Sequence, residues 1–273
     1  MDTTWICRVL ANPRLEVLPT ANPDAVAAVL PSGVKVTVTC SPKFGVDKTV
    51  ELACQLRQRG LLAVPHIAAR GVAGPAHLQR IVQQLAEQGI DEVFVVGGDA
   101  ERPVGEYATA LELLEALASA ARRPSSVGVA GYPEGHPSVA EEALMAALVA
   151  KQRYASYVTA QISFNPEAIC RWLSRIRGAG VNLPVYLCLP GCIRWDRLVR
   201  IGLRLGLGAS LRYLEKQRGL AGFLLTGGAL YDPWSTIQGL GEATCEGRDQ
   251  VVGIHWSTFN EVAATWQWIH NKQ

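Results

Sequence analysis

The stretch that decides the fold is Val-Gly-Val-Ala-Gly-Tyr-Pro-Glu-Gly-His-Pro, residues 127–137. Its first four residues form a short apolar run typical of a buried strand, and the run ends at Gly131. The polar segment that follows contains two prolines, which indicates a loop. Because ligands bind at the carboxyl ends of parallel strands in α/β proteins, we expect Tyr132, Glu134 and His136 to lie at a binding site. The alternative is a loop whose polar side chains only cap the next helix.

The same unit of apolar strand, polar loop and helix recurs along the chain. Strands are predicted at residues 14–17, 34–39, 62–67, 92–96, 127–130, 157–161, 185–189 and 251–256. Helices are predicted at residues 25–30, 47–59, 75–88, 107–121, 138–152, from 165 onward, and at 195–205, 210–218, 234–240 and 260–269.

This alternation of strand and helix favours one fold class. Continuous apolar strands belong to a parallel sheet that is buried on both faces. We therefore predict an α/β fold, a single (βα)8 TIM barrel over residues 1–273 with extra helices between strands 7 and 8. The alternative is a doubly wound sheet, but no GxGxxG follows the first strand. The nearest string, residues 206–210, lacks the third glycine and is interpreted as a turn.

Composition excludes several classes of protein. The formal net charge of +2 gives no excess of positive charge for binding nucleic acid. No apolar run approaches the 18 or so residues of a membrane span, and no basic region precedes an apolar run at Met1–Trp5. The seven cysteines contain no CxxC pair, which fits a reducing compartment. We expect a cytoplasmic protein, and the sequence predicts no particular oligomeric state.

Polar side chains gather where the predicted strands end: Glu16, Thr39, His66, Asp99, Tyr132, Glu134, His136, Gln161, Ser257 and Asn260. A carboxylate directly after a buried strand costs free energy unless it is paired or used, which singles out Glu16 and Asp99. One such acid can donate a proton, and a second, ionised one can stabilise a cation. Structural alternatives remain for Thr39 as a plain strand residue, for His66 as a hydrogen-bonded histidine and for Asn260 as the N-cap of the last helix.

A divalent-metal site is the rival use for these strand ends. Nitrogen and oxygen ligands are offered by His66, Asp99, Glu134, His136 and His255. The spacing argues against it, because there is no HxH, HExxH or cysteine–histidine cluster, and His255 precedes its strand end. No serine lies in a GxSxG elbow either. A metal-dependent hydrolase or lyase is therefore the less favoured hypothesis, and no metal is expected.

Six segments resemble, in order along the chain, motifs of the methylenetetrahydrofolate reductase family. The strongest is Ala130–Pro137, similar to the family's Ala-Xaa-Tyr-Pro-Glu-Xaa-His-Pro. The others are Leu15–Pro19 (Phe-Glu-Phe-Phe-Pro in the family), Pro65-His66 (Pro-His), Gly98-Asp99 (the end of Arg-Gly-Asp), Thr159–Asn165 (Thr-Gln-Phe-Phe-Phe-Asp) and His255–Asn260 (His-Phe-Tyr-Thr-Leu-Asn).

The resemblance implies an eight-stranded barrel that reduces 5,10-methylenetetrahydrofolate to 5-methyltetrahydrofolate, normally through FAD reduced by NAD(P)H. It implies that Glu16 is the general acid that opens the imidazolidine ring to a 5-iminium cation. Asp99 would stabilise that cation and Gln161 would hold the pterin by hydrogen bonds. Phe164 would pack against the folate or nucleotide, with a core position as the alternative. The residues expected at the cofactor are Thr39, His66, Tyr132, Glu134 and His136.

Departures from the family pattern concern the flavin. The family's phosphate-binding arginine before Gly-Asp is Gly97 here, and its ribose-binding aspartate falls near Leu144 or Met145. Each lost charge-assisted contact is worth about 1.5 to 3 kcal/mol, which argues against tight FAD binding. Other flavin contacts are matched by Thr39, Tyr132, His136 and Lys151, and the family's Pro-Gly-Ile-Leu-Pro at strand 7 is replaced by Cys-Leu-Pro-Gly-Cys at residues 188–192.

This pattern is similar to the flavin-independent members of the family, in which NADH or NADPH passes hydride directly to the folate. Two alternatives stay open: the same reaction through bound FAD, and a non-catalytic folate-binding module. Four arginines after strand 7 share one helical face: Arg194, Arg197, Arg200 and Arg204. Arg197 is the candidate for the folate's glutamate tail, while a solvated helix face is the alternative for most of them.

Overall fold

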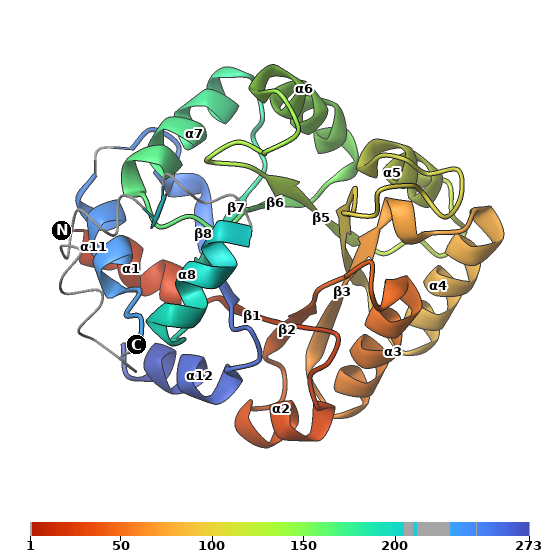
Figure 1. The fold of residues 1–273 in the computed structure, drawn as a ribbon, viewed down its shortest axis with the longest axis horizontal. Helices are drawn as coiled ribbons and strands as arrows, with labels where there is room; N and C mark the ends of the chain where they lie inside the picture. Colours follow the sequence, from red (N-terminus) through yellow and green to blue (C-terminus); the bar gives the residue numbers. More distant parts are fainter. Residues whose placement is uncertain (1, 205–209, 212–229, 244, 273) are drawn as a thin grey trace. The chain divides into compact units, whose positions relative to one another are not determined.

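The structure is a computed structural model that describes residues 2–204, 210–211, 230–243 and 245–272. Eight strands form a closed barrel in which the strand order follows the sequence (Figure 1). They are β1 (Pro13–Val17), β2 (Lys35–Val38), β3 (Leu62–Ala68), β4 (Glu92–Val96), β5 (Ser126–Gly131), β6 (Tyr157–Ala160), β7 (Val185–Pro190) and β8 (Val251–Ser257). The predicted (βα)8 barrel is confirmed.

Helices connect the strands, as the periodicity predicts. They are α1 (Thr3–Leu10), α2 (Pro23–Val29), α3 (Gly45–Gln58), α4 (Pro75–Glu87), α5 (Ala110–Ala118), α6 (Glu141–Lys151), α7 (Pro166–Gly178), α8 (Trp195–Arg204), α11 (Trp234–Glu242) and α12 (Val262–His270). Two of these, α8 and α11, fall between β7 and β8, where extra helices are predicted. The helix predicted at 210–218 and the turn at 206–210 lie almost wholly outside the described residues.

Helix α1 is an element that the sequence analysis missed. Asp2 caps it by accepting a hydrogen bond of 3.0 Å from the backbone N–H of Trp5. Its apolar face, formed by Trp5, Ile6, Val9 and Leu10, is buried and packs on β8 and α11. The signal was present, because an aspartate followed by apolar residues at a spacing of four predicts a capped helix.

The last helix begins two residues later than predicted. Asn260, expected to be its N-cap, precedes the helix, and the N-cap is Glu261. Both Phe259 and Asn260 have left-handed backbone, with φ of 51° and 71°. Asparagine tolerates that conformation better than most residues. The N-cap prediction is therefore wrong, and Asn260 instead turns the chain between β8 and α12.

The chain divides into two compact units. The first comprises Met1–Pro13, Gly131–Val149 and Thr159–Gln273, and the second comprises Arg14–Ala130 and Ala150–Val158. In the first, Trp256 of β8 packs on Trp268 of α12, with ring centroids 5.4 Å apart. Because side chains alternate along a strand, the buried neighbour His255 faces the inner side of β8.

In the second unit a charged layer lies at the amino-terminal ends of the strands. Arg14 and Lys35 both pair with Glu92, at 2.5 and 2.6 Å. The Arg14 guanidinium also lies 4.1 Å from the centre of the Tyr157 ring. That ring fills the space beside Gly128, where an added Cβ would come within 2.3 Å of it. The sequence analysis did not identify this layer.

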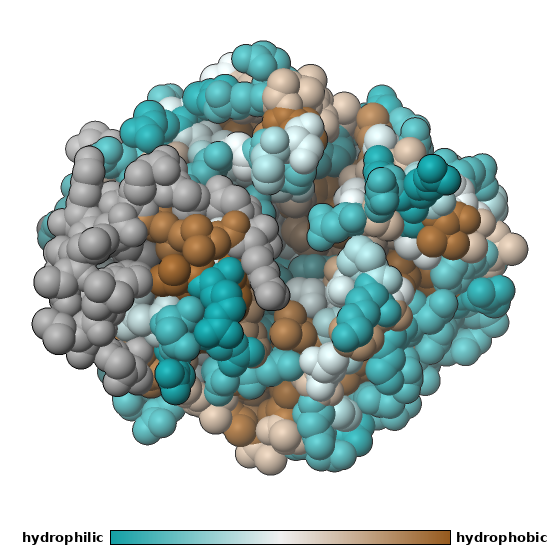
Figure 2. Space-filling model, in the orientation of Figure 1, coloured by the Kyte–Doolittle hydropathy of each residue, from teal (hydrophilic) through white to brown (hydrophobic). Residues whose placement is uncertain are grey.

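On the face that Figure 2 shows, the described residues are mainly hydrophilic, with apolar residues between them. The exposed large hydrophobic residues are Phe44, Leu62, Val104, Val139, Val149, Leu203 and Leu230. Among the described residues, no helix combines the length and the apolar character that crossing a membrane requires.

Candidate active site

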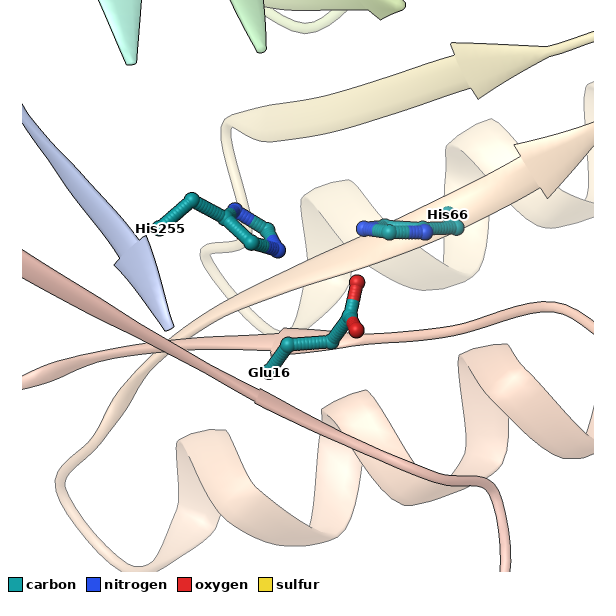
Figure 3. Close-up of side chains that lie close together, drawn as sticks. All are labelled: Glu16, His66 and His255. Atoms are coloured by element: carbon teal, nitrogen blue, oxygen red, sulfur yellow. The ribbon is translucent and has the colours of Figure 1, made fainter. Parts of the chain in front are cut away.

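Glu16 lies on β1 between the buried residues Leu15 and Val17, so its own side chain points to the opposite face of the strand. His66 lies on β3, is buried at 8% exposure, and packs its ring on Phe94 with centroids 4.6 Å apart. The Glu16 carboxylate and the His66 ring point toward one another, and their possible ligand atoms lie within 4.8 Å (Figure 3). Figure 3 also draws His255. A half-buried carboxylate beside an imidazole can donate and accept protons.

Asp99 follows β4 on a turn that requires glycine. Gly98 has φ of +91°, and a Cβ there would lie 2.9 Å from the Cβ of Ala68. Asp99 itself is exposed, so the expectation that burial makes this carboxylate costly is wrong. Burial raises the pKa of the nearby Cys40 thiol, and the Asp99 charge adds to that rise. Asp99 therefore lies beside the ends of β2 and β3 as a solvated negative charge.

Arg70 holds the loop that carries Asp99, and the sequence analysis missed it. Its guanidinium donates hydrogen bonds to three carbonyl oxygens of that loop, those of Ala100 at 2.9 Å, Glu101 at 3.2 Å and Ala108 at 3.0 Å. Its backbone N–H donates to the Gly97 carbonyl at 3.0 Å. The sequence signal for this role was an arginine two residues after the end of β3, followed by glycine. Arg70 thus holds the loop on which Asp99 lies.

Thr39 directly follows β2, and Lys151 lies near the carboxyl end of β5. The Thr39 backbone accepts a hydrogen bond from Thr49 on α3 and donates one to the Val17 carbonyl, both at 3.0 Å. Lys151, at the end of α6, is buried at 8% exposure and directs its ammonium at the Ala130 carbonyl, 3.4 Å away. Burial lowers the pKa of this lysine to about 8. It is a cation able to meet a polar ligand at the end of β5.

Tyr132 and His136 lie together on the loop after β5. Their rings meet edge to face with centroids 5.5 Å apart. The His136 Nδ1 accepts a hydrogen bond of 3.2 Å from the Ser138 backbone, which leaves Nε2 as the protonated nitrogen of the neutral ring. Both side chains are partly exposed, so they remain accessible to a ligand.

Glu134 is occupied by contacts within the protein. Its Oε1 accepts hydrogen bonds from the Ser163 hydroxyl at 2.5 Å and from the Ser210 hydroxyl. Its Oε2 accepts the Ser210 backbone N–H at 3.0 Å. The Ser210 hydroxyl in turn accepts the N–H of Phe164 at 2.8 Å. Glu134 therefore joins the loops after β5 and β6, a role that the sequence analysis did not consider.

Gln161 follows β6 and is partly exposed, with its backbone N–H donating to the Gly131 carbonyl at 2.7 Å. Its amide can donate and accept at once, as binding a pterin ring requires. Phe164, three residues later, is fully buried in an apolar cluster that includes Tyr231, whose ring centre lies 5.9 Å away. Phe164 therefore occupies a core position, which was the alternative prediction, and none of its surface is accessible to a ligand.

Arg197 is engaged on both terminal guanidinium nitrogens, Nη1 and Nη2. It pairs with Glu261 at 2.7 Å and donates to the Phe259 carbonyl at 2.9 Å, which joins α8 to the turn before α12. Arg194 and Arg200 both pair with Asp196, at 2.9 and 3.5 Å. The side chain of Arg204 lies outside the described part. These contacts fit a solvated helix face for Arg194 and Arg200 and a structural contact for Arg197.

Comparison with known proteins identifies a family that this chain matches. The family model described as methylenetetrahydrofolate reductase matches residues 20–196. A curated relative, methylenetetrahydrofolate reductase 1 of Schizosaccharomyces pombe, is 26% identical over 76 residues, which is 27% of this chain. The matched part spans 13% of that yeast protein.

Solved structures share the fold. The carboxyl transferase domain of Rhizobium etli pyruvate carboxylase, solved with 3-hydroxypyruvate, superposes with a TM-score of 0.52 over 98% of this chain at 12% identity. The Y628A form with pyruvate gives 0.51 over 99% at 12% identity. This chain covers 47% and 48% of those chains. At such low identity the likeness describes the barrel and carries nothing about substrates.

Proposed function

The chain belongs to the methylenetetrahydrofolate reductase family, and from that membership we propose that it reduces 5,10-methylenetetrahydrofolate to 5-methyltetrahydrofolate with hydride taken directly from NADH or NADPH. The observation that carries the reaction is the family match over residues 20–196. The retained Glu16, Asp99 and Gln161 support catalysis over a non-catalytic folate-binding module. The seven cysteines without a CxxC pair fit a reducing compartment, so we propose that the reaction takes place in the cytoplasm.

Each step of the proposed reaction has a residue. Glu16 gives its proton to N10, the N10–methylene bond breaks, and the methylene carbon becomes part of a 5-iminium cation. The Asp99 carboxylate stabilises that cation by charge, and the Gln161 amide orients the pterin. Hydride then passes from the dihydronicotinamide to the iminium carbon, which yields the methyl group and NAD(P)+. Direct transfer requires both substrates in one ternary complex.

The residues of this chain do not fit tight binding of FAD. The position of the family's phosphate-binding arginine is Gly97, which has no side chain, and a Cβ built there meets no atom within 4 Å. Near the family's ribose-binding aspartate stand Leu144 and Met145, which are apolar and partly buried. The remaining matches, Tyr132 and His136 among them, suit an aromatic ring and serve equally for a nicotinamide. Flavin therefore takes no part in the proposed steps.

The test is made in one cuvette. The purified protein is scanned from about 300 to 550 nm, the range of flavin bands, and NADH and then 5,10-methylenetetrahydrofolate are added. We expect no flavin bands and NADH oxidation that depends on the folate. Initial rates with both substrates varied should give intersecting lines, because a ternary complex forms. A flavin-depleted sample that gave parallel, ping-pong lines would contradict direct transfer.

Other outcomes identify the alternatives. Yellow protein that NADH alone bleaches would restore the FAD mechanism. Colourless protein without turnover, even with added FAD and NADPH, would overturn the reductase proposal. Metal analysis before and after EDTA would then test the hydrolase or lyase alternative, since Glu16 and His66 are ligand types for divalent metals. Folate binding without turnover would instead support the binding module.

A further inference from the structure

Two half-buried thiols, of Cys170 and Cys245, lie in contact far apart in the sequence. Cys170 is on α7, and Cys245 lies between α11 and β8. Their side chains are hydrogen-bonded to each other, and both are free thiols. A disulfide requires two cysteines whose side chains already approach one another. A hydrogen-bonded thiol pair meets that requirement.

The backbone around Cys245 is held firmly against α7. A Cβ built at Gly247 would lie 2.9 Å from the Arg177 side chain and 3.6 Å from the Leu173 carbonyl, so this segment packs directly on the helix. The Arg248 guanidinium donates hydrogen bonds to the carbonyls of Leu240, Gly241 and Ala243. The two thiols are thus brought together by fixed backbone, and α7 and α11 lie side by side (Figure 1).

The environment gives the two sulfurs different roles. The pKa of the Cys170 thiol is lowered by the hydrogen bond from Cys245, against an opposing effect of burial, and the charges of Arg248 and Arg171 lower it further. The pKa of Cys245 is raised by that same hydrogen bond and by burial. Of the two thiols, Cys170 is therefore the one that loses its proton more readily. A thiolate beside guanidinium groups is the reactive form of cysteine.

We propose that Cys170 and Cys245 form a reversible disulfide, a modification site in which Cys170 reacts first with a hydroperoxide and Cys245 resolves the product. The Cys170 thiolate attacks one peroxide oxygen, the O–O bond breaks, and a sulfenic acid and water form once a proton is taken up. The Cys245 sulfur then displaces a second water from the sulfenic sulfur. In sum, two thiols lose two hydrogens and two electrons, and hydrogen peroxide becomes two waters.

The test uses the whole protein with hydrogen peroxide as the probe. Reduced protein is titrated with the oxidant, alkylated and mapped by peptide mass spectrometry. We expect a crosslinked pair of peptides that contains Cys170 and Cys245, formed before the exposed Cys7 reacts and reversed by dithiothreitol. The proposal is overturned if both thiols remain alkylatable when Cys7 is oxidised, or if Cys170 goes to sulfinic acid without a crosslink.

Variants separate the two roles. In C245S, dimedone should trap a sulfenic acid at Cys170, whereas in C170S, Cys245 should stay reduced. C7S is the matched control and should form the crosslink as the wild type does. Arg171→Gln should slow crosslinking, because it removes a positive charge that lowers the pKa of Cys170, while Arg171→Lys should not. If either serine variant fails to fold, the wild-type map still decides the question.

Discussion

The two ends of the strands in the unit Arg14–Ala130 with Ala150–Val158 use charge in opposite ways. At the amino-terminal ends, Arg14 and Lys35 are both paired with Glu92, and the Arg14 guanidinium lies over the Tyr157 ring. At the carboxyl ends, Glu16 faces the imidazole of His66, and Asp99 is exposed to solvent. The first group is a closed set of complementary charges, and the second is a set of acids open to a ligand.

This difference indicates which end of the strands contributes to stability and which end is available for catalysis. Burial alone would raise the pKa of Glu92, but the charge of Arg14 and the hydrogen bond and charge of Lys35 hold it below its ordinary value. Such an acid stays ionised and has no proton to give near neutral pH. A catalytic acid must reach the substrate, and in barrels of this kind the substrate binds at the carboxyl ends of the strands. In barrels of this kind the amino-terminal end serves stability.

The largest effect should come from Glu16→Gln, which removes the proposed proton donor and keeps the shape. We expect kcat for folate-dependent NADH oxidation to fall about 10³-fold, within the range for loss of a general acid. The unfolding midpoint should stay near that of the wild type, because glutamine keeps the size and shape of the side chain at this half-buried position. Steady-state kinetics and thermal unfolding measure the two quantities.

Glu101→Gln is the matched control, since Glu101 is an exposed carboxylate on the loop that carries Asp99. It should keep wild-type kcat. If Glu16→Gln lost stability while keeping its turnover, Glu16 would belong with the structural charges, and the contrast between the two ends would collapse.

The second effect tests the opposite end. Glu92→Gln leaves Arg14 and Lys35 without their buried partner, and breaking such a pair costs about 3 kcal/mol. The control is Glu51→Gln, which removes an exposed pair with Lys48 and should cost less than about 0.5 kcal/mol. Urea unfolding at neutral pH gives both values. A loss for Glu92→Gln no larger than for Glu51→Gln would show that the layer is not a source of stability.

The pH dependence of the Glu92 layer has a definite sign. Because its folded-state pKa is lowered below 4.5, the stabilisation is present above pH 4.5 and is lost as pH falls through the lower folded value. The wild type should therefore lose stability in acid faster than Glu92→Gln does. Unfolding curves between neutral and acid pH should converge for the two proteins, and curves that stay parallel would contradict this account.

The fold was predictable because its signals are local. The strand 92–96 has the predicted bounds, and α4 begins at Pro75 as predicted. The errors fall where tertiary contacts decide: α1 is stabilised by packing on β8, and the N-cap of α12 moved to Glu261 because Asn260 is needed for a left-handed turn. Periodicity finds an element, but only the folded chain sets where a turn must reverse.

The site was predictable only in its residue types. That Glu16, His66 and Asp99 lie toward or after the carboxyl ends of β1, β3 and β4 follows from the sequence pattern, but the side-chain contacts do not. Nothing in the sequence shows that Glu134 is occupied by serines at 163 and 210, which lie 29 and 76 residues away. The same holds for Arg14 and Glu92, which are 78 residues apart and meet only once the strands pair.

A smaller effect should come from Arg70, which orders the carboxyl-end loop without touching a substrate. Arg70→Gln loses the three hydrogen bonds that hold the Asp99 loop, and we expect kcat to fall roughly tenfold, as for a misplaced catalytic group. KM for NADH should change little, and Arg70→Lys should restore part of kcat. The exposed Arg102 on the same loop is the control. Equal loss in Arg102→Gln would show a general disturbance of the loop.

The smallest effect concerns Lys151, a charge at the carboxyl end whose ammonium is directed at the Ala130 carbonyl. Its pKa falls from 10.5 to about 8, so between pH 8 and 10.5 the unfolded chain binds more protons than the folded one. Stability should therefore rise with pH there, by roughly 1 kcal/mol per pH unit. Lys151→Met should abolish that rise, while Lys48→Met, at an exposed position, should keep it. Urea unfolding from pH 7 to 9.5 compares the slopes of stability against pH. Equal slopes for the wild type and Lys151→Met would mean that the Lys151 ammonium is solvated in the folded protein. The carboxyl end would then resemble the amino-terminal layer in having no uncompensated buried charge.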